Sequence, residues 1–207
     1  MKEKEIERLT NMLEIEHRLY DKGYINIAGI DEAGRGPLCG PVVAAAVILP
    51  KDKKIEGVND SKKLTEKKRE KLYDDIMNEA VAVGVGISEV DVIEKVNILN
   101  ATKIAMKKAI ENLKVKPDYC LIDGNQMIDI VIDAETVVSG DAKSESIAAA
   151  SIIAKVTRDR MLIDYDKLYP EYGFAKHKGY GTKAHIEAIK KYGLTPIHRP
   201  SFCKKFV

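Results

Sequence analysis

The sequence lacks any apolar segment long enough to cross a membrane, and it contains very little cysteine. The longest uninterrupted apolar run among its 207 residues is Val42 to Leu49, whereas a membrane-spanning helix needs about 20 residues. The first eight residues mix acidic and basic side chains, which is unlike a secretory signal peptide. The three cysteines lie far apart and form no CxxC pair. We therefore expect reduced thiols in a cytoplasmic protein, with neither a disulfide framework nor a zinc site.

Charge is balanced over the whole chain but not along it. The chain has 34 Lys and Arg against 32 Asp and Glu, and its content of 45% hydrophobic and 32% charged residues is that of an ordinary globular domain. Residues 173–207 carry eight basic residues and one acid, a net charge of +7, so the remainder of the chain is at −5. This local excess is typical of a surface that binds a polyanion, and a solvated basic tail is the alternative.

Hydrophobic periodicity predicts an α/β fold with a mixed sheet. The predicted strands cover 25–30, 42–49, 81–87, 119–122 and 130–138, and the predicted helices cover 4–20, 65–80, 97–113, 143–165 and 183–192. The last third of the chain is helical and basic, with an irregular end. We expect an N-terminal helix in residues 1–24, a central domain over 25–165 and a helical C-terminal extension over 166–207, together forming one continuous unit.

Four acidic residues stand where an open α/β sheet binds its ligands, beyond the carboxyl ends of strands. Asp31 and Glu32 follow one apolar strand, Asp123 ends another, and Asp141 precedes the long helix. Carboxylates gathered in space repel one another unless a cation offsets them. Mg²⁺ or Mn²⁺ takes such oxygen ligands and also holds substrate phosphates.

Each acid also has a simpler structural interpretation. Asp123 before glycine is typical of a turn, and Asp141 is typical of a helix N-cap. Adjacent residues of a regular strand point to opposite faces. Asp31 and Glu32 would therefore share a metal site only if the chain breaks at Glu32, which Gly34 and Gly36 make plausible.

Several polar segments are candidate substrate contacts. In Gly34-Arg35-Gly36, bare backbone N–H groups can donate to a sugar hydroxyl or phosphate, and the Arg35 fork suits phosphate. A polar stripe at helical spacing on the long helix could hold phosphates or simply meet solvent. Tyr180, between glycines, could stack on a base or sugar, or be a half-buried turn residue. The candidates in the stripe are Ser144, Ser151, Lys155 and Arg158, and the candidate in the loop that begins at Asp60 is Lys62.

The motifs resemble those of bacterial ribonuclease HII, a type 2 ribonuclease H. The resemblance runs from about Ile25 to Phe202, and the 30 residues ahead of Asp31 leave no room for the extra N-terminal domain of ribonuclease HIII. The motifs, in the family's order, are Ile30-Asp31-Glu32-Ala-Gly-Arg-Gly-Pro, Asp60-Ser-Lys-Lys-Leu, Ile122-Asp123-Gly, Gly140-Asp141, the segment Ala149 to Asp159, His177-Lys-Gly-Tyr180-Gly-Thr and His198-Arg-Pro-Ser-Phe.

This resemblance implies a ribonuclease-H-like fold and endonucleolytic cleavage of the RNA strand in RNA–DNA hybrids. It also implies incision 5′ of single ribonucleotides in duplex DNA. The four acids Asp31, Glu32, Asp123 and Asp141 would hold two Mg²⁺ or Mn²⁺ ions, and the products would carry a 5′-phosphate and a 3′-hydroxyl. Gly34-Arg35-Gly36, aided by Tyr180, would read the 2′-hydroxyl. We expect a monomer that acts without a membrane.

Two other classes of function remain open at this point. The first is another metal-dependent nuclease of the same fold that cleaves branched DNA. The second is a nucleic-acid-binding module without catalysis, in which the acids serve as caps and turns. Neither requires a reader of the 2′-hydroxyl next to Asp31 and Glu32.

Overall fold

The core of the molecule is a mixed five-stranded sheet, as the sequence predicts. The computed structural model describes all 207 residues. The strands are β1 (Ile27–Ala33), β2 (Val42–Ile48), β3 (Ala82–Ser88), β4 (Tyr119–Asp123) and β5 (Asp133–Val137), in the order β3-β2-β1-β4-β5. β2 is antiparallel to β1 and β3, whereas β4 is parallel to β1 and β5.

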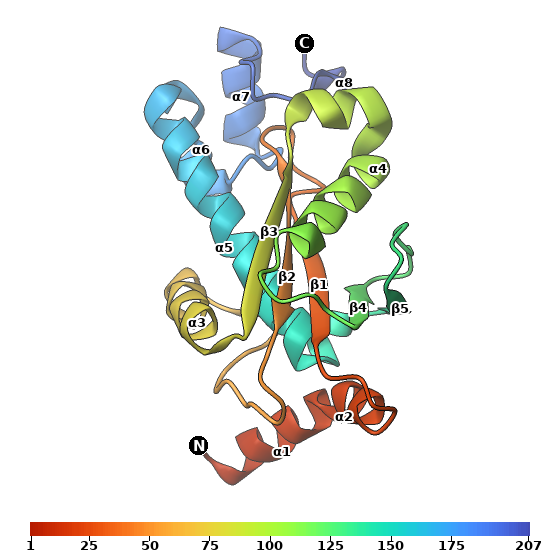
Figure 1. Cartoon of the computed structure of the whole chain (residues 1–207). Coiled ribbons are helices and arrows are strands. Elements are labelled where there is room, and N and C mark those ends of the chain that lie inside the picture. Colours follow the sequence, from red (N-terminus) through yellow and green to blue (C-terminus); the bar gives the residue numbers. More distant parts are fainter.

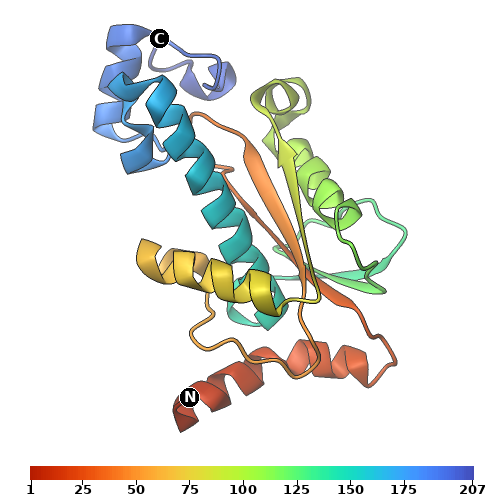
Figure 2. The same ribbon diagram turned by 60° about the vertical axis from the view of Figure 1, so that its left-hand side comes forward.

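Helices cover both faces of this sheet. α4 packs on one face and α3 and α5 lie on the other, while α1 and α2 sit at one end of the molecule and α7 and α8 at the opposite end (Figures 1 and 2). None of the helices combines the length and apolar character needed to span a membrane. The α-helices are α1 (Glu3–Met12), α2 (Glu14–Tyr20), α3 (Glu66–Glu79), α4 (Val90–Glu111), α5 (Glu145–Leu168), α6 (Phe174–His177), α7 (Lys183–Tyr192) and α8 (Pro200–Cys203), and the short 3₁₀ helices are η1 (Ser61–Lys63), η2 (Gly140–Ala142) and η3 (Pro170–Tyr172).

The structure corrects two of the predicted helices and the predicted irregular end. The segment 4–20 forms two helices that meet at Leu13. α4 begins at Val90, seven residues before the predicted start at Asn97. Asn97 itself has a non-helical φ of 66°, which marks a kink inside the helix. The Asn97 side chain accepts a hydrogen bond from Asn100 N at 3.1 Å, so it caps the second half of a kinked helix. The C-terminal end is not wholly irregular, because it contains α8.

Small residues allow the helices to approach the sheet closely. β2 is buried along its whole length, and alternate positions of β3 are buried. A Cβ at Gly86 would overlap the backbone of α4, and a Cβ at Gly29 of β1 would overlap the backbone of Ser146 at the start of α5. α5 therefore rests directly on the strand that carries Asp31, which fixes the distance between them.

A buried carboxylate attaches α2 to the start of α5. Glu16 is 3% exposed. Its Oε1 accepts hydrogen bonds from Ser144 Oγ at 2.6 Å, Ser146 Oγ at 2.7 Å and Ser146 N at 3.2 Å. Donors that surround a buried carboxylate offset part of its desolvation cost. The N-terminal helices therefore support the end of α5 that follows Asp141.

The contact between β1 and α5 predicts the effect of a single added methyl group. Gly29→Ala should destabilise the protein by about 3 kcal/mol, because neither backbone can retreat. Gly57→Ala is the matched control, since Gly57 has open space and a φ of +85°. Its cost should be only the backbone strain of about 1 kcal/mol. Urea unfolding of both variants measures the difference, and equal losses would contradict this packing.

Candidate active site

Strand register places Asp31 beside Asp123. β1 and β4 are parallel and Ile30 pairs with Ile122, so the next residue of each strand faces the same side of the sheet. Asp123 Oδ1 accepts a hydrogen bond of 2.7 Å from Gly140 N, which ties η2 and its Asp141 to the end of β4. Three of the four predicted acids, from three separate segments, are thereby brought together.

Glu32 reaches the site without the predicted break in the strand. β1 continues in regular register through Glu32 to Ala33, and the chain turns only at Gly34, where φ is +98°. The expected break at Glu32 is therefore wrong by two residues. Because β1 ends one residue later, at Ala33, Glu32 still borders the same cleft as Asp31. Arg35 Nη1 donates to Glu32 Oε1 at 3.3 Å.

Asp141 does not cap the long helix. The N-cap of α5 is Ser144, whose hydroxyl accepts from Ile147 N at 3.2 Å. Asp141 lies three residues earlier in η2, after Ser139 in a left-handed conformation. The interpretation of Asp141 as a helix cap is wrong, and its carboxylate is free of that structural task.

The gathered carboxylates perturb one another's ionisation. Burial, followed by the charges of Glu32 and Asp123, holds the pKa of Asp31 well above its usual range. Burial also raises the pKa of Glu32, although Arg35 partly opposes the shift. The pKa of Asp141 is raised by burial and then by the charges of Asp60 and Asp123. For all three acids burial is the largest cause of the raised pKa, and the neighbouring negative charges add to it.

Lys62, in a short loop, is a second cation close to the acids, in addition to Arg35 beside Glu32. Burial tends to lower its pKa, but the charges of Asp31 and three other acids outweigh that effect and raise it. Asp60 caps the loop by accepting from Lys62 N at 2.9 Å. Ser61 N donates to Ser151 Oγ at 3.3 Å, which anchors the loop to α5.

The donor set fits a divalent cation such as Mg²⁺ or Mn²⁺. All four side chains offer carboxylate oxygens, which these hard cations prefer, and no histidine or thiol stands among them. The raised pKa values point the same way, because a bound cation would relieve the repulsion.

A cleft of about 460 Å³ opens beside the acids and contains most of the predicted substrate contacts. A smaller cavity of about 50 Å³ adjoins Glu32 and Asp123, and its polar lining residues Lys103, Asn125 and Gln126 were not predicted as site residues. No motif in the sequence singles out these three. The larger cleft is lined by Asp31, Glu32, Ala33, Gly34, Arg35, Gly36, Ser61, Lys62, Lys155 and Tyr180.

The polar stripe on α5 mostly faces the protein interior, which corrects its interpretation as a row of phosphate contacts. Ser151 is 2% exposed, donates to Ala148 O at 2.9 Å and holds the Ser61 loop. Ser144 is buried against Glu16. Arg158 is buried too, and its guanidinium donates to backbone carbonyls. Of this stripe, only Lys155 lines the cleft.

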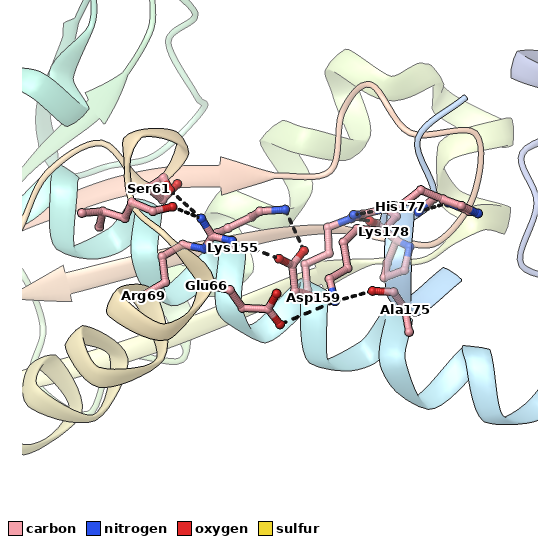
Figure 3. A network of polar contacts seen from close by, with 12 residues as sticks. Ser61, Glu66, Arg69, Lys155, Asp159, Ala175, His177 and Lys178 are labelled. Carbon is pink, nitrogen blue, oxygen red and sulfur yellow. Dashed lines mark hydrogen bonds and ion pairs between the residues drawn. The ribbon is translucent and has the colours of Figure 1, made fainter. Parts of the chain in front are cut away.

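Lys155 belongs to a polar network that joins three helical segments (Figure 3). Its ammonium donates to Asp159 at 2.7 Å, and burial lowers its pKa despite this bond. Arg69 of α3 lies 3.9 Å from Asp159 and donates to the Ser61 carbonyl at 3.0 Å. Lys178, beyond α6, lies 3.8 Å from Glu66. The network ties the loop that carries Lys62 to the segment that carries Tyr180.

Tyr180 stands at the mouth of the cleft on a hydrogen-bonded support. Its ring is half exposed and lies near Gly36. His185 Nδ1 lies 2.9 Å from the Tyr180 carbonyl, and its Nε2 lies 3.0 Å from His198 Nε2. Because Thr195 N donates to His198 Nδ1, we assign the proton to His198 Nε2, which donates to His185.

The two histidines and Cys39 place three potential ligand atoms within 4.8 Å of one another. Burial lowers the pKa of both histidines to about 4 and raises that of the Cys39 thiol to about 12. The Nε2 of His198 carries a proton and points at His185, so it has no lone pair for a metal. The cluster is a neutral support for the Tyr180 segment.

The basic C-terminal segment includes one cation that is not on the surface. Arg199 is fully buried and donates to carbonyls of the segment from Gly34 to Gly40. Arg199 therefore counts toward the net charge of the segment but not toward its exposed basic surface. Its place in the His198-Arg-Pro-Ser-Phe motif was the available signal, but charge alone does not separate a buried arginine from surface lysines.

Comparison with known proteins decides the family. The family model described as Ribonuclease HII matches residues 28–205. The chain belongs to the ribonuclease HII family. Ribonuclease HII of Acetivibrio thermocellus is 63% identical over 99% of this chain and 80% of its own length. That of Clostridioides difficile is 59% identical over the same shares. The chain is thus a ribonuclease H, a hydrolase.

Solved structures agree with this fold. The ribonuclease H2 of Pyrococcus horikoshii OT3 is 31% identical, with a TM-score of 0.72 over 88% of this chain and 97% of its own. The ribonuclease HII in the PCNA complex from Archaeoglobus fulgidus is 26% identical, with a TM-score of 0.72 over 84% of this chain and 94% of its own. Bst-RNase HIII in complex with Mn²⁺, at 19% identity and a TM-score of 0.61, shares the fold over 82% of this chain and 63% of its own.

The repulsion among the carboxylates predicts a gain in stability when one is neutralised. In metal-free buffer, Asp31→Asn should raise the free energy of unfolding by about 1 kcal/mol, since it removes a buried like charge. Asp74→Asn on the exposed face of α3 is the control and should have little effect. Urea unfolding with EDTA measures both. A destabilised Asp31→Asn would show that the acids do not repel one another.

Proposed function

We propose that this ribonuclease H cleaves the RNA strand of RNA–DNA hybrids and incises 5′ of single ribonucleotides embedded in duplex DNA, leaving a 5′-phosphate and a 3′-hydroxyl. The observation that carries the proposal is the position of Gly34-Arg35-Gly36, which lines the same cleft as Asp31 and Glu32. The groups proposed for hydrolysis and those proposed for ribose recognition therefore lie side by side. Incision at a lone ribonucleotide requires this proximity, since only one 2′-hydroxyl is available.

The carboxylates of Asp31, Glu32, Asp123 and Asp141 would hold a pair of divalent cations, in keeping with a family of enzymes that use such metals. When bound, the ions would supply an activated water and stabilise the departing 3′-oxygen. Asp31 would contribute to holding both ions, because it adjoins Glu32 in β1 and the strand register sets it beside Asp123.

Cationic side chains would orient the scissile strand. Lys62 and Lys155 line the cleft on the side of α5, and Arg35 lines it next to Glu32. Each can donate to non-bridging phosphate oxygens, and the Arg35 guanidinium can do so with two parallel bonds. Because the three side chains come from different segments of the chain, they would hold the phosphate from several directions next to the acids.

The glycine-rich loop would read the sugar. The N–H groups of Gly34, Arg35 and Gly36 donate to no protein acceptor, so they are free to bond a 2′-hydroxyl. The Tyr180 ring, beside Gly36, would stack on the adjacent sugar. Because the 2′-hydroxyl is what distinguishes RNA from DNA at a single position, this loop would confine cleavage to ribonucleotides.

Exposed lysines at the C-terminal end would bind phosphates of the duplex outside the cleft. Lys190 and Lys191 end α7, and Lys204 and Lys205 follow α8. α7 and the C-terminus lie together at one end of the molecule (Figure 1). Contacts of this kind with phosphates release counterions, so binding should weaken as salt increases.

The catalytic proposal predicts a strict dependence on the acids and on metal. On duplex DNA with one ribonucleotide, Asp31→Asn should lower kcat by at least 10³-fold, while binding, which rests on phosphate contacts, changes little. EDTA should abolish wild-type cleavage, and added Mg²⁺ or Mn²⁺ should restore it. Gel analysis of an end-labelled strand measures the site of the cut. Cleavage of branched all-DNA substrates instead would favour a different nuclease.

Tyr180 tests the sugar contact separately. Tyr180→Ala should lower kcat/KM on a single-ribonucleotide duplex by about 5- to 150-fold, the equivalent of the 1–3 kcal/mol of a stacking contact. Tyr180→Phe keeps the ring and should stay within about threefold of wild type, since no partner holds the phenol hydroxyl. Equal activity of Tyr180→Ala and wild type would remove Tyr180 from recognition.

A further inference from the structure

Arg199 is a buried cation directly behind the glycine-rich loop. Its Nη2 donates to Gly34 O at 2.7 Å, and its Nη1 donates to Arg35 O at 3.1 Å and to Pro37 O at 2.9 Å. Nε and Nη2 both donate to Gly40 O, at 2.9 and 2.7 Å. A single guanidinium thus holds four carbonyls of the segment that follows β1.

This cation has no carboxylate partner. The charge of Glu94 acts on Arg199, but its carboxylate accepts hydrogen bonds from Ser201 N at 3.1 Å and Ser201 Oγ at 2.6 Å. Burial, followed by the charge of Arg158, lowers the pKa of Arg199 to about 10, so it stays protonated at neutral pH. A buried charge that is offset only by peptide carbonyls is costly. Such a group suggests a task beyond stability.

Peptide geometry links this cation to the cleft. Every peptide bond of the chain is trans. In a trans peptide, the carbonyl and the N–H of the next residue point in opposite directions. Since the carbonyls of Gly34 and Arg35 point inward to Arg199, the N–H groups of Arg35 and Gly36 point away from it. Those N–H groups have no protein acceptor, and the loop lines the cleft.

The positive charge also acts through the peptide bonds. A hydrogen bond to a carbonyl polarises the peptide group and makes its N–H a stronger donor, particularly where water is excluded. Arg199 would therefore both aim the two N–H groups and strengthen them. The Phe202 ring, whose centroid lies 5.1 Å from the guanidinium carbon, holds Arg199 from its other side.

We infer that Arg199 is a positioning residue for ribose recognition, which fixes the backbone N–H groups of Arg35 and Gly36 toward the 2′-hydroxyl of the substrate. The inference rests on the proposed function of the loop. It places part of the substrate selectivity in the C-terminal extension, 164 residues along the chain from Arg35. Arg199 itself need not touch the nucleic acid.

Arg158 offers a matched comparison. It is also a buried arginine bound to backbone carbonyls, but its acceptors belong to Cys39, Pro41 and Lys178. It donates to neither Gly34 nor Arg35. Replacing Arg158 by lysine therefore removes an equivalent guanidinium while the carbonyls of the loop stay bound to Arg199.

The experiment compares Arg199→Lys and Arg158→Lys at a temperature where both are folded. The substrate is duplex DNA with one ribonucleotide, and the competitor is the all-DNA duplex of the same sequence. Arg199→Lys should lower kcat/KM at least tenfold, with KI of the competitor within threefold of wild type, because phosphate contacts are untouched. Arg158→Lys, whose acceptors do not include Gly34 or Arg35, should lose less kcat/KM than Arg199→Lys does. Phe202→Leu, which loosens Arg199 without removing it, should lower kcat/KM two- to fivefold.

The outcomes separate this inference from the function on which it rests. Wild-type incision with equal losses of kcat/KM in Arg199→Lys and Arg158→Lys would overturn the inference alone, since both arginines would then be merely structural. A rise in KI that parallels the loss of kcat/KM would overturn it too. If Arg199→Lys does not fold, unchanged kcat/KM in Phe202→Leu would overturn it. Failure of the wild-type protein to incise the duplex would overturn the proposed function itself.

Discussion

Mutual repulsion among carboxylates at the ends of β1 and β4 is the constraint on which the rest of the site depends. Strand register forces Asp31 next to Asp123, and the bond from Gly140 N to Asp123 brings Asp141 to the same place. Burial strengthens the repulsion by excluding water. The protein supplies two close cations, Arg35 and Lys62, yet burial and the neighbouring acids still raise the pKa values of Asp31 and Glu32. The site is therefore arranged to be completed by divalent cations.

The elements around this charge cluster hold it rigid. Gly29 lets α5 lie directly on β1, and Glu16 secures the start of that helix. The C-terminal extension holds the other wall of the cleft, because Arg199 donates to the carbonyl of Gly34 and His185 hydrogen-bonds the carbonyl of Tyr180. A site that discriminates by one hydroxyl needs such support, since a small displacement of a donor forfeits its hydrogen bond.

The sequence predicted the elements and the meeting of Asp31, Asp123 and Asp141 well, because both leave local signals. Apolar runs that end in acids identified the strands that carry Asp31 and Asp123. The errors arose where tertiary contacts decide. Ser151 has the spacing of a surface residue, yet it is buried because the Ser61 loop folds over α5. Arg199 resembles any basic residue of the tail, and only the folded chain shows that it is buried against backbone carbonyls.

The central claim is that the four carboxylates together hold divalent cations. The most direct measurement is an anomalous difference map at the manganese absorption edge, from crystals of the wild-type protein grown with Mn²⁺ and an all-DNA duplex, which it is not expected to cleave. The account predicts two manganese peaks beside Asp31, each within about 2.2 Å of carboxylate or phosphate oxygens. A map with no peak at Asp31, and manganese only at surface acids, would contradict it.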